Sequence, residues 1–309
     1  MKIYNSIEEF EITSKTVVTI GTFDGVHSGH KVIIEQLKNI AKKNDAETVI
    51  LTFFPHPRMV LYPDDNELRL LNTIDERIYM LKEAGIDHLI IHPFSKEFSR
   101  LSSTEFVRDI LVNQLNVSTL VIGYDHHFGR NREGSFEHLL ELGPLYDFEV
   151  EEIPAQEIQQ INISSTKVRF SLLNGEIHAA NQFLGYNYFL KGVVVDGEKI
   201  GRTIGFPTAN IKINEWYKLI PAKGVYAVKI ELDGRTFDGM LNIGSRPTLN
   251  KSNNEIIEVN IFNFEEEIYT KEIEIKFFER IRDEKKFKDI SSLKKQLEID
   301  KKKVIQIFN

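Results

Sequence analysis

The sequence predicts an α/β domain built on a parallel sheet, followed by a small antiparallel β-barrel with a C-terminal helix. In the first part of the 309-residue chain, short apolar runs alternate with amphipathic stretches, as in a parallel sheet covered by helices. After residue 186 the apolar period changes to two, which is typical of antiparallel strands joined by turns. All nine histidines precede this point. We therefore expect two domains, residues 1–186 and 187–309, with imidazole chemistry in the first alone.

The composition predicts an ordinary soluble protein. Hydrophobic residues make up 41% of the chain and charged residues 28%, and the net charge is −7. No apolar run approaches the length of a membrane span and the first residues lack a signal-peptide core, so we expect a cytoplasmic protein without membrane association. The chain has no cysteine, which excludes disulfides and thiolate nucleophiles. Its second half is only mildly basic, and this does not indicate nucleic-acid binding.

The stretch from Val17 to His30 predicts a strand, a glycine turn and the start of a helix over residues 29–44. Such a turn presents unpaired backbone N–H groups and the positive end of a helix dipole, which together bind phosphate. His27 and His30 are three residues apart at this helix start, so both rings can face one anion. A zinc pair and a simple turn histidine are the alternatives.

The rest of the first half continues the alternation of strands and helices. Residues 48–53 read as a strand buried on both faces, and a proline-stiffened loop around His56 follows it. Ligands of open α/β sheets bind at the carboxyl ends of strands, so His56 is placed for a substrate, with a rigid turn as the alternative. Further strands are expected at residues 89–91 and 119–122, and capping boxes predict helices that begin after Thr73 and Ser102. No dinucleotide or P-loop glycine pattern is present.

Two loops of the first half combine charged, hydroxyl and glycine residues. Residues 123–134 directly follow a predicted strand, and their arginines and Phe128 suit phosphate, carbonyl and ring contacts. Residues 163–169 place serine, threonine, lysine and arginine at a helix start, which predicts a second anion site. A solvated loop and a plain capped helix are the respective alternatives.

In the second half, strands are expected at residues 189–196, 224–232, 237–242, 255–262 and 272–282, and an apolar stripe from Ile290 to Phe308 predicts the closing helix. Residues 201–210 are rich in glycine, which allows backbone to approach phosphate, and Thr208 and Asn210 supply oxygen ligands that suit Mg²⁺. Strand alternation puts Glu258 opposite its apolar neighbours, as a candidate base. A turn and a solvent-facing glutamate are the alternatives.

These stretches together resemble a known family. His27-Ser28-Gly29-His30 is similar to the His-x-Gly-His motif of the nucleotidylyltransferase superfamily, and the longer run from Gly21 resembles the prokaryotic bifunctional riboflavin kinases and FAD synthetases. The resemblance continues through residues 123–134, 163–169, 201–210 and 242–248, the strand around Glu258 and the segment 282–287, and thus covers nearly the whole chain. It departs from the family pattern at His126, Asn263 and Thr270.

The resemblance implies a Rossmann-like nucleotidylyltransferase domain followed by a riboflavin kinase barrel. In the first domain it implies catalysis by His27, His30 and Arg169, ATP binding by Gly21, Phe23, Asp24, Gly29, Ser164, Ser165 and Thr166, and flavin binding by His56, Asp125, Phe128 and Arg132. In the barrel it implies Glu258 as the catalytic base, ATP binding by Gly201, Gly205, Thr208 and Asn210, metal binding by Thr208 and Asn210, and flavin contact by Arg282.

The activity implied by the resemblance is the synthesis of flavin cofactors. The barrel would phosphorylate riboflavin to FMN, and the first domain would adenylylate FMN with ATP to give FAD and pyrophosphate. Mg²⁺ is the expected cofactor, and riboflavin, FMN, FAD and ATP are the expected ligands of a monomer or weak homo-oligomer. Two other classes remain open at this point: an adenylyltransferase for another substrate, and a non-catalytic flavin-binding or nucleic-acid-binding protein.

Overall fold

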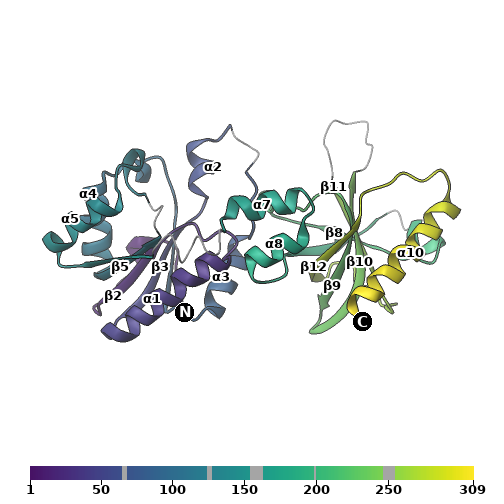
Figure 1. Cartoon of the computed structure of the whole chain (residues 1–309), viewed down its shortest axis with the longest axis horizontal. Coiled ribbons are helices and arrows are strands. Elements are labelled where there is room, and N and C mark those ends of the chain that lie inside the picture. Colours follow the sequence, from purple (N-terminus) through teal and green to yellow (C-terminus); the bar gives the residue numbers. More distant parts are fainter. Residues whose placement is uncertain (65–67, 124–126, 154–162, 198–199, 246–254) are drawn as a thin grey trace. The chain divides into compact units, whose positions relative to one another are not determined.

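The computed structural model describes the chain except residues 65–67, 124–126, 154–162, 198–199 and 246–254. It contains two compact units, Met1–Ser165 and Thr166–Asn309 (Figure 1). Helices α7 (Ser165–Leu173) and α8 (Ile177–Leu184) fall almost entirely in the second unit, ahead of the boundary expected at residue 186. Their hydrogen bonds explain this: the Asn181 amide donates to the Phe277 carbonyl at 2.9 Å, and the Leu172 carbonyl accepts from Ala222 at 3.0 Å.

The first unit is built on a six-stranded sheet in the order β1-β4-β3-β2-β5-β6, and every strand pair in it is parallel. The strands are β1 (Lys2–Tyr4), β2 (Thr16–Ile20), β3 (Glu47–Phe53), β4 (His88–His92), β5 (Val117–Gly123) and β6 (Glu149–Ile153). The helices are α1 (Ser28–Asn44), α2 (Pro57–Leu61), α3 (Ile74–Glu83), α4 (Ser103–Glu105), the π-helical η3 (Phe106–Gln114) and α5 (Phe136–Tyr146), with single 3₁₀ turns η1 (Ile7–Glu9), η2 (Phe98–Arg100) and η4 (Arg130–Arg132).

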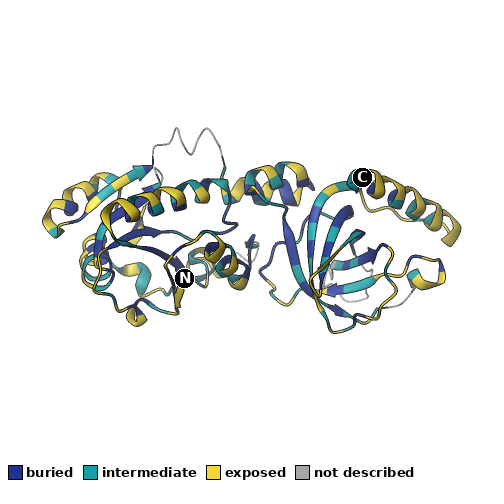
Figure 2. Ribbon diagram, turned by 90° about the horizontal axis from the view of Figure 1, so that it is seen from below, coloured by how far each residue is buried: buried dark blue, intermediate teal, exposed yellow. Residues whose placement is uncertain are grey.

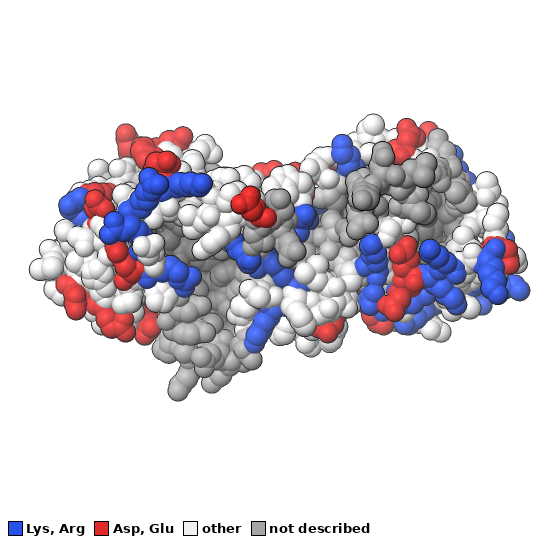
Figure 3. Space-filling view, turned by 90° about the horizontal axis from the view of Figure 1, so that it is seen from above, with Lys and Arg blue, Asp and Glu red and all other residues white. Residues whose placement is uncertain are grey.

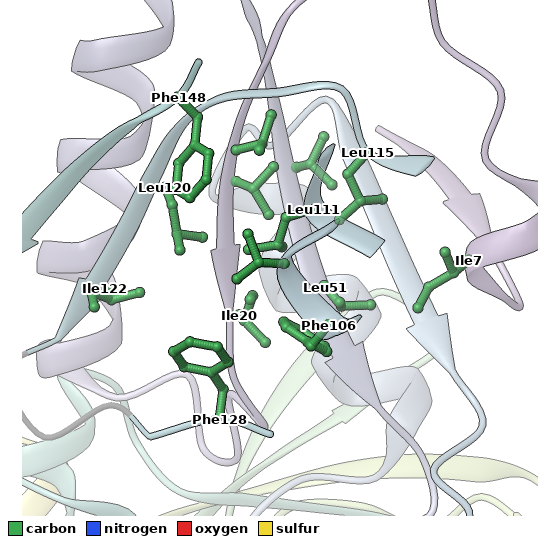
Figure 4. Packing of buried hydrophobic residues seen from close by; sticks show 14 of the residues in the cluster. Ile7, Ile20, Leu51, Phe106, Leu111, Leu115, Leu120, Ile122, Phe128 and Phe148 are labelled. Atoms are coloured by element: carbon green, nitrogen blue, oxygen red, sulfur yellow. The ribbon is translucent and has the colours of Figure 1, made fainter. Parts of the chain in front are cut away.

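Helices cover both faces of this sheet, as the continuous apolar runs predict. Val17 and Ile50 pack with Leu37 of α1 on one face, whereas their neighbours Val18 and Leu51 pack with η3 and α5 on the other. The strands are accordingly buried along most of their length (Figure 2). Figure 4 shows the second of these clusters, in which Phe128 and Phe106 lie at one end of the sheet's apolar layer.

The strand order reverses beside β2. From β2 the chain continues to β3 and β4 on one side and then crosses to β5 and β6 on the other. Open parallel sheets bind ligands at the carboxyl ends of the strands at such a switch point. The turn that carries His27 and His30 follows β2 directly, so the topology places it there.

The second unit contains a closed antiparallel barrel in the order β10-β11-β8-β7-β12-β9. Its strands are β7 (Phe189–Val195), β8 (Ala209–Lys212), β9 (Gly224–Leu232), β10 (Arg235–Ser245), β11 (Glu255–Ile261) and β12 (Glu272–Arg282), and its helices beyond α8 are the short α9 (Ile200–Thr203) and α10 (Ile290–Phe308). Helix α10 packs on β10 and β12 through Leu293, Leu297 and Val304. The predicted fold class is thus confirmed for both halves.

Three strands are absent from the sequence-based prediction. β1 has only three residues, and β6 is a run of glutamates with few apolar positions. β8 begins within the stretch that we assigned to a phosphate-binding loop, at Ala209. Within the described part of the chain, no helix is long and apolar enough to cross a membrane. On the face drawn in Figure 3, acidic and basic side chains lie side by side on each unit.

Candidate active sites

The turn between β2 and α1 holds the histidine pair in a fixed geometry. His27 is the N-cap of α1, and its Nδ1 accepts a hydrogen bond from the His30 backbone N–H at 3.3 Å. The two imidazoles stack with their centroids 3.7 Å apart and their planes 15° from parallel. Phe23 lies against His30 with a centroid distance of 4.9 Å. Both rings therefore stand on the same side of the helix start, as their spacing predicts.

Asp24 joins the turn between β2 and α1 to two segments that are distant in the sequence. Its side chain is fully buried, and its carboxylate accepts from the Leu71 and Asn72 backbone N–H groups at 2.9 and 3.2 Å. Its backbone carbonyl accepts from the Ser165 hydroxyl at 2.8 Å. The predicted ATP contact of Asp24 is untested, and the structure gives its carboxylate a role in holding the segment before α3 against the turn. Ser165 is thereby brought to the histidine turn.

The other predicted residues of this site are divided between the two units, with Gly21, Gly29 and Ser164 in the first and Thr166 and Arg169 in the second. Gly29 lies against the His27 ring, where an added Cβ would be 3.2 Å from two ring atoms and 3.9 Å from the Ile163 carbonyl. Gly21 is similarly close to the Phe23 ring, and Ser164 is exposed beside Ser165. Thr166 and Arg169 lie in α7 within the second unit, so their approach to the histidine pair stays a prediction.

The surroundings of His30 keep its imidazole neutral. Burial lowers the pKa of His30 well below its ordinary value, and the positive charges of His27 and Arg77 lower this pKa further. Its Nδ1 is buried and has no hydrogen-bond partner among the described residues. Arg77, in α3, is only 1% exposed, and its Nη1 lies 3.4 Å from the Thr52 hydroxyl. The sequence-based prediction missed Arg77, because its charge acts on His30 only once the fold brings α3 to the histidine turn.

This pKa shift predicts a pH-dependent loss of stability. The unfolded chain has a His30 pKa near 6.5 and therefore binds a proton before the folded chain does, so the free energy of unfolding falls as the pH drops below that value. We expect the thermal midpoint to fall more between about pH 7.5 and about pH 5.5 in the natural chain than in His30→Gln, by calorimetry. Equal falls in the two proteins would contradict the assigned environment of His30.

A cavity of about 980 Å³ lies at the carboxyl ends of β2 and β3. Aromatic side chains from several separate segments line it: Phe53, Tyr62, Phe94, Phe98, Phe106 and Phe128. Of the four predicted flavin contacts, His56, Phe128 and Arg132 line this one cavity, and Asp125 lies outside the described residues, as does His126. Gly21 also lines it. A cavity that combines aromatic rings with a few cationic groups suits a large flat ring that carries a phosphate.

The sequence reading missed the rings of Phe94 and Phe98. Phe94 lies just after the end of β4, and Phe98 begins η2 in the same connection. The two rings pack edge to face on each other at 5.9 Å and lie beside Phe53 at 5.5 Å each. The signal that was available is their place after a strand of a parallel sheet, where ligands bind.

In the barrel, three polar residues form a row across neighbouring strands. Glu258 of β11 pairs with Asn210 of β8 on one side and with Asn242 of β10 on the other. Ile257 and Val259, on either side of Glu258, are buried in the barrel. Glu258 itself is half-buried and lines a cavity of about 300 Å³ together with Thr208. The position of Glu258 in a cavity wall favours its role as a candidate base over the alternative of a solvent-facing glutamate.

Thr208 lies where two cavities meet. It lines the Glu258 cavity, whose apolar walls include Phe206, Phe287 and Leu293, and also a second cavity of about 420 Å³ beside Phe264 and Tyr269. Gly201 packs against the segment that leads to Thr208, since a Cβ added to Gly201 would be 2.1 Å from the Phe206 carbonyl oxygen and 3.4 Å from the Thr208 hydroxyl oxygen. Gly205 takes a φ of +83° in open space, which glycine adopts readily. Two pockets that share a threonine can hold two substrates side by side.

The oxygen atoms of Thr208 and Asn210 suit a hard cation. A hydroxyl and an amide carbonyl are typical Mg²⁺ ligands, although two such groups make an incomplete shell, which nucleotide phosphates ordinarily complete. The Asn210 side chain packs directly on the backbone of Gly197, because a Cβ added to Gly197 would be 1.9 Å from the Asn210 amide nitrogen. Among the residues that the structure describes, no cluster of three histidine, aspartate or glutamate side chains could hold a metal by itself.

Two further residues organise this site without having been predicted. Asn260 is 6% exposed, and its side-chain amide donates to the Pro207 carbonyl at 2.6 Å, immediately before Thr208. Asp300 of α10 is 1% exposed and accepts from Nε and Nη2 of Arg282 at 2.9 and 2.8 Å. Arg282 lines the Glu258 cavity, so this ion pair fixes its orientation there. Both contacts join segments far apart in the sequence, which the pattern of either segment does not reveal.

Two sites that suit phosphate groups, one in each unit, define a two-domain nucleotide-dependent transferase. The family model for FAD synthetase matches residues 9–167, and the family model for riboflavin kinase matches residues 184–308. The chain belongs to the family of bifunctional riboflavin kinase/FMN adenylyltransferases.

Relatives that carry this name match nearly the whole chain. That of Bacillus subtilis is 38% identical over 97% of this chain and 94% of its own length, and that of Listeria monocytogenes is 41% identical over 94% and 92%. That of Escherichia coli K12 is 33% identical over 94% and 92%. A crystal structure from Streptococcus pneumoniae, which bears the name macrolide-efflux protein, superposes with a TM-score of 0.89 at 31% identity over 97% of both chains. The likeness thus extends over both domains.

Proposed function

We propose that each unit performs one of two consecutive reactions, the phosphorylation of riboflavin in the barrel and the adenylylation of FMN in the first unit. The observation that carries this proposal is the pairing of an aromatic cavity with an anion site in each half of the chain. In the first unit the cavity of Phe128 and Arg132 follows the same strands as the histidine turn. In the barrel Thr208 joins two cavities beside Glu258.

In the barrel, Glu258 acts as the base. The ribityl hydroxyl of riboflavin attacks the γ-phosphorus of ATP, Glu258 accepts the hydroxyl proton, and the bond to the leaving ADP breaks. Thr208 and Asn210 would hold the Mg²⁺ that accompanies ATP, and this ion would supply positive charge beside the phosphates. Arg282, fixed by Asp300, orients the flavin at the apolar wall formed by α10.

In the first unit the nucleophile is already an anion. A phosphate oxygen of FMN attacks the α-phosphorus of ATP, and pyrophosphate leaves, so no strong base is needed. Positioning and charge stabilisation carry the catalysis. The neutral His30 donates a hydrogen bond to the phosphates, and His27, Ser165, Thr166 and Arg169 are proposed to hold the α-phosphate and the leaving group. Gly21, Phe23, Gly29 and Ser164 complete the proposed ATP site.

The remaining assignments belong to the same proposal. Riboflavin, FMN, FAD and ATP are the ligands, Mg²⁺ is the ion, and the reactions take place in the cytoplasm in a monomer or weak homo-oligomer. The proposed two-site enzyme is tested by incubating the protein with riboflavin, ATP and Mg²⁺ and separating the flavins by chromatography over time. FMN that appears before FAD supports it. Riboflavin that stays unchanged, together with FMN that is not adenylylated, would overturn it in favour of another adenylyltransferase substrate or a binding protein.

The contact between Asn260 and Pro207 predicts a selective defect. Asn260→Ala removes the hydrogen bond that holds the residue before Thr208 to the strand of Glu258. We expect the rate of FMN formation to fall roughly tenfold, the scale of one lost buried hydrogen bond, while FAD formation from supplied FMN is unchanged. Steady-state kinetics of both reactions checks this. Asn214→Ala, at an exposed position that follows β8 in the same unit, is the matched control, and unchanged kinetics in Asn260→Ala would refute the assignment.

A further inference from the structure

The loop from Phe128 to Gly134 shapes one wall of the large cavity in the first unit. Phe128, Gly129, Asn131 and Arg132 all line this cavity. An antiparallel bridge closes the loop, since Phe128 and Gly134 exchange backbone hydrogen bonds of 3.2 and 2.9 Å. Gly134 leaves room for the Phe128 ring, because an added Cβ would be 2.5 Å from it. The bridge thus joins the two ends of the loop, and the residues between them face the cavity.

The backbone at the tip of this loop is strained. Asn131 and Arg132 have φ angles of +55° and +61°, in the left-handed region that L-residues other than glycine seldom occupy. Such a conformation is unfavourable for an L-residue and persists only where its surroundings fix it. Arginine has no local hydrogen bond of its own to favour this region, unlike asparagine. Contacts outside the tip must therefore hold Arg132 in place.

The contacts that hold the loop come from the segment before η3. Glu133 Oε1 accepts a hydrogen bond of 2.9 Å from the Ser103 backbone N–H, at the start of the helical segment that runs through Gln114. This N–H has no partner within the helix, and the dipole there favours a carboxylate. The Leu101 carbonyl accepts from the Arg130 N–H at 2.7 Å. Gly129 lies so close that an added Cβ would be 2.8 Å from the Ser103 nitrogen.

We propose that Glu133 is a positioning residue for the FMN site, holding Arg132 and Phe128 in their cavity-lining geometry through its bond to Ser103. Glu133 is not among the residues that line the cavity, so it acts through the loop and not on the ligand. The proposal rests on the assignment of this cavity to FMN made above. Without the Ser103 contact the strained tip relaxes, and both side chains leave the positions that face the ligand.

The test measures FMN binding to the full chain by quenching of flavin fluorescence, together with KM values for FMN and ATP. Glu133→Ala is expected to raise the dissociation constant and the KM for FMN roughly tenfold, the scale of a hydrogen bond to a charged group. The KM for ATP and the rate of FMN formation from riboflavin stay unchanged. Glu133→Gln retains an oxygen acceptor for Ser103 and is expected to stay within about threefold of the natural chain.

Two further variants separate the possible failures. Glu137→Ala removes an exposed carboxylate of α5, which contacts the Ser135 hydroxyl at 2.6 Å, but leaves the Ser103 contact, so FMN binding should not change. Phe128→Ala removes a cavity-lining ring and should weaken FMN binding. If Phe128→Ala weakens binding and Glu133→Ala does not, the positioning role is refuted and the FMN site stands. If neither affects binding, the site assignment itself fails. A rise in the KM for ATP equal to that for FMN, or a general loss of folding in both Glu133 variants, would also refute the positioning role.

Discussion

His30→Ala is expected to lower the rate of FAD formation from FMN about 10²-fold, the usual scale for one transition-state hydrogen-bond donor. The imidazole of His30 stacks on His27 at the switch point of the sheet, and burial keeps it neutral. A neutral imidazole donates one hydrogen bond to a phosphate oxygen without needing to be protonated first. Loss of this donor affects the transition state, in which negative charge moves onto the leaving pyrophosphate.

The measurement is the steady-state rate of FAD formation from FMN and ATP, with the rate of FMN formation from riboflavin measured on the same preparation. His138→Ala is the matched control, because His138 lies in α5 of the same unit and away from the histidine turn. The variant His30→Ala should retain FMN formation at the natural rate. Equal loss of both activities would show that the two reactions do not have separate sites.

The second large effect concerns the barrel. Glu258→Gln is expected to lower FMN formation about 10³-fold, within the usual range for the loss of a general base. The amide keeps the size of the side chain and its place between Asn210 and Asn242, but it cannot accept the proton of the ribityl hydroxyl. The substitution preserves the shape of the cavity, so binding of riboflavin should change little.

FMN formation from riboflavin and Mg-ATP checks this prediction, and FAD formation from supplied FMN reports on the first unit. Glu279→Gln is the control, since Glu279 lies on the barrel strand β12 and faces Lys303 at 3.9 Å. A Glu258→Gln protein that phosphorylates riboflavin at the natural rate would remove Glu258 from the reaction. The barrel would then need another base.

Much of the fold follows from local pattern. The apolar period alone separates the parallel sheet of the first unit from the barrel, because a strand buried on both faces and a half-buried strand differ in sequence. The capping boxes at Thr73 and Ser102 are both present in the structure. What local pattern misses is β6, where the burial of one face is supplied by distant residues, and β8, where a turn-rich stretch becomes a strand by pairing with β7 and β11.

The site residues also divide into those that a local motif predicts and those that come together only in the folded chain. Residues within one motif, such as the pair His27 and His30, are found together because the turn and helix that hold them are local. The aromatic cavity combines rings from loops after several strands, and its members meet only once the sheet has formed. Asn260 and Asp300 act through contacts with Pro207 and Arg282, and nothing in their own neighbourhoods marks them. The sequence therefore predicts the candidate site residues better than the residues that hold them in place.

The central claim is that two different phosphorus atoms of ATP react at two sites in one chain. The most direct measurement supplies riboflavin with ATP labelled either in the γ-phosphate or in the α-phosphate, and follows the label into the separated flavins. The account predicts that the γ label enters FMN first and FAD afterwards, whereas the α label enters FAD and never FMN. An α label in FMN, or flavins that carry neither label, would contradict it.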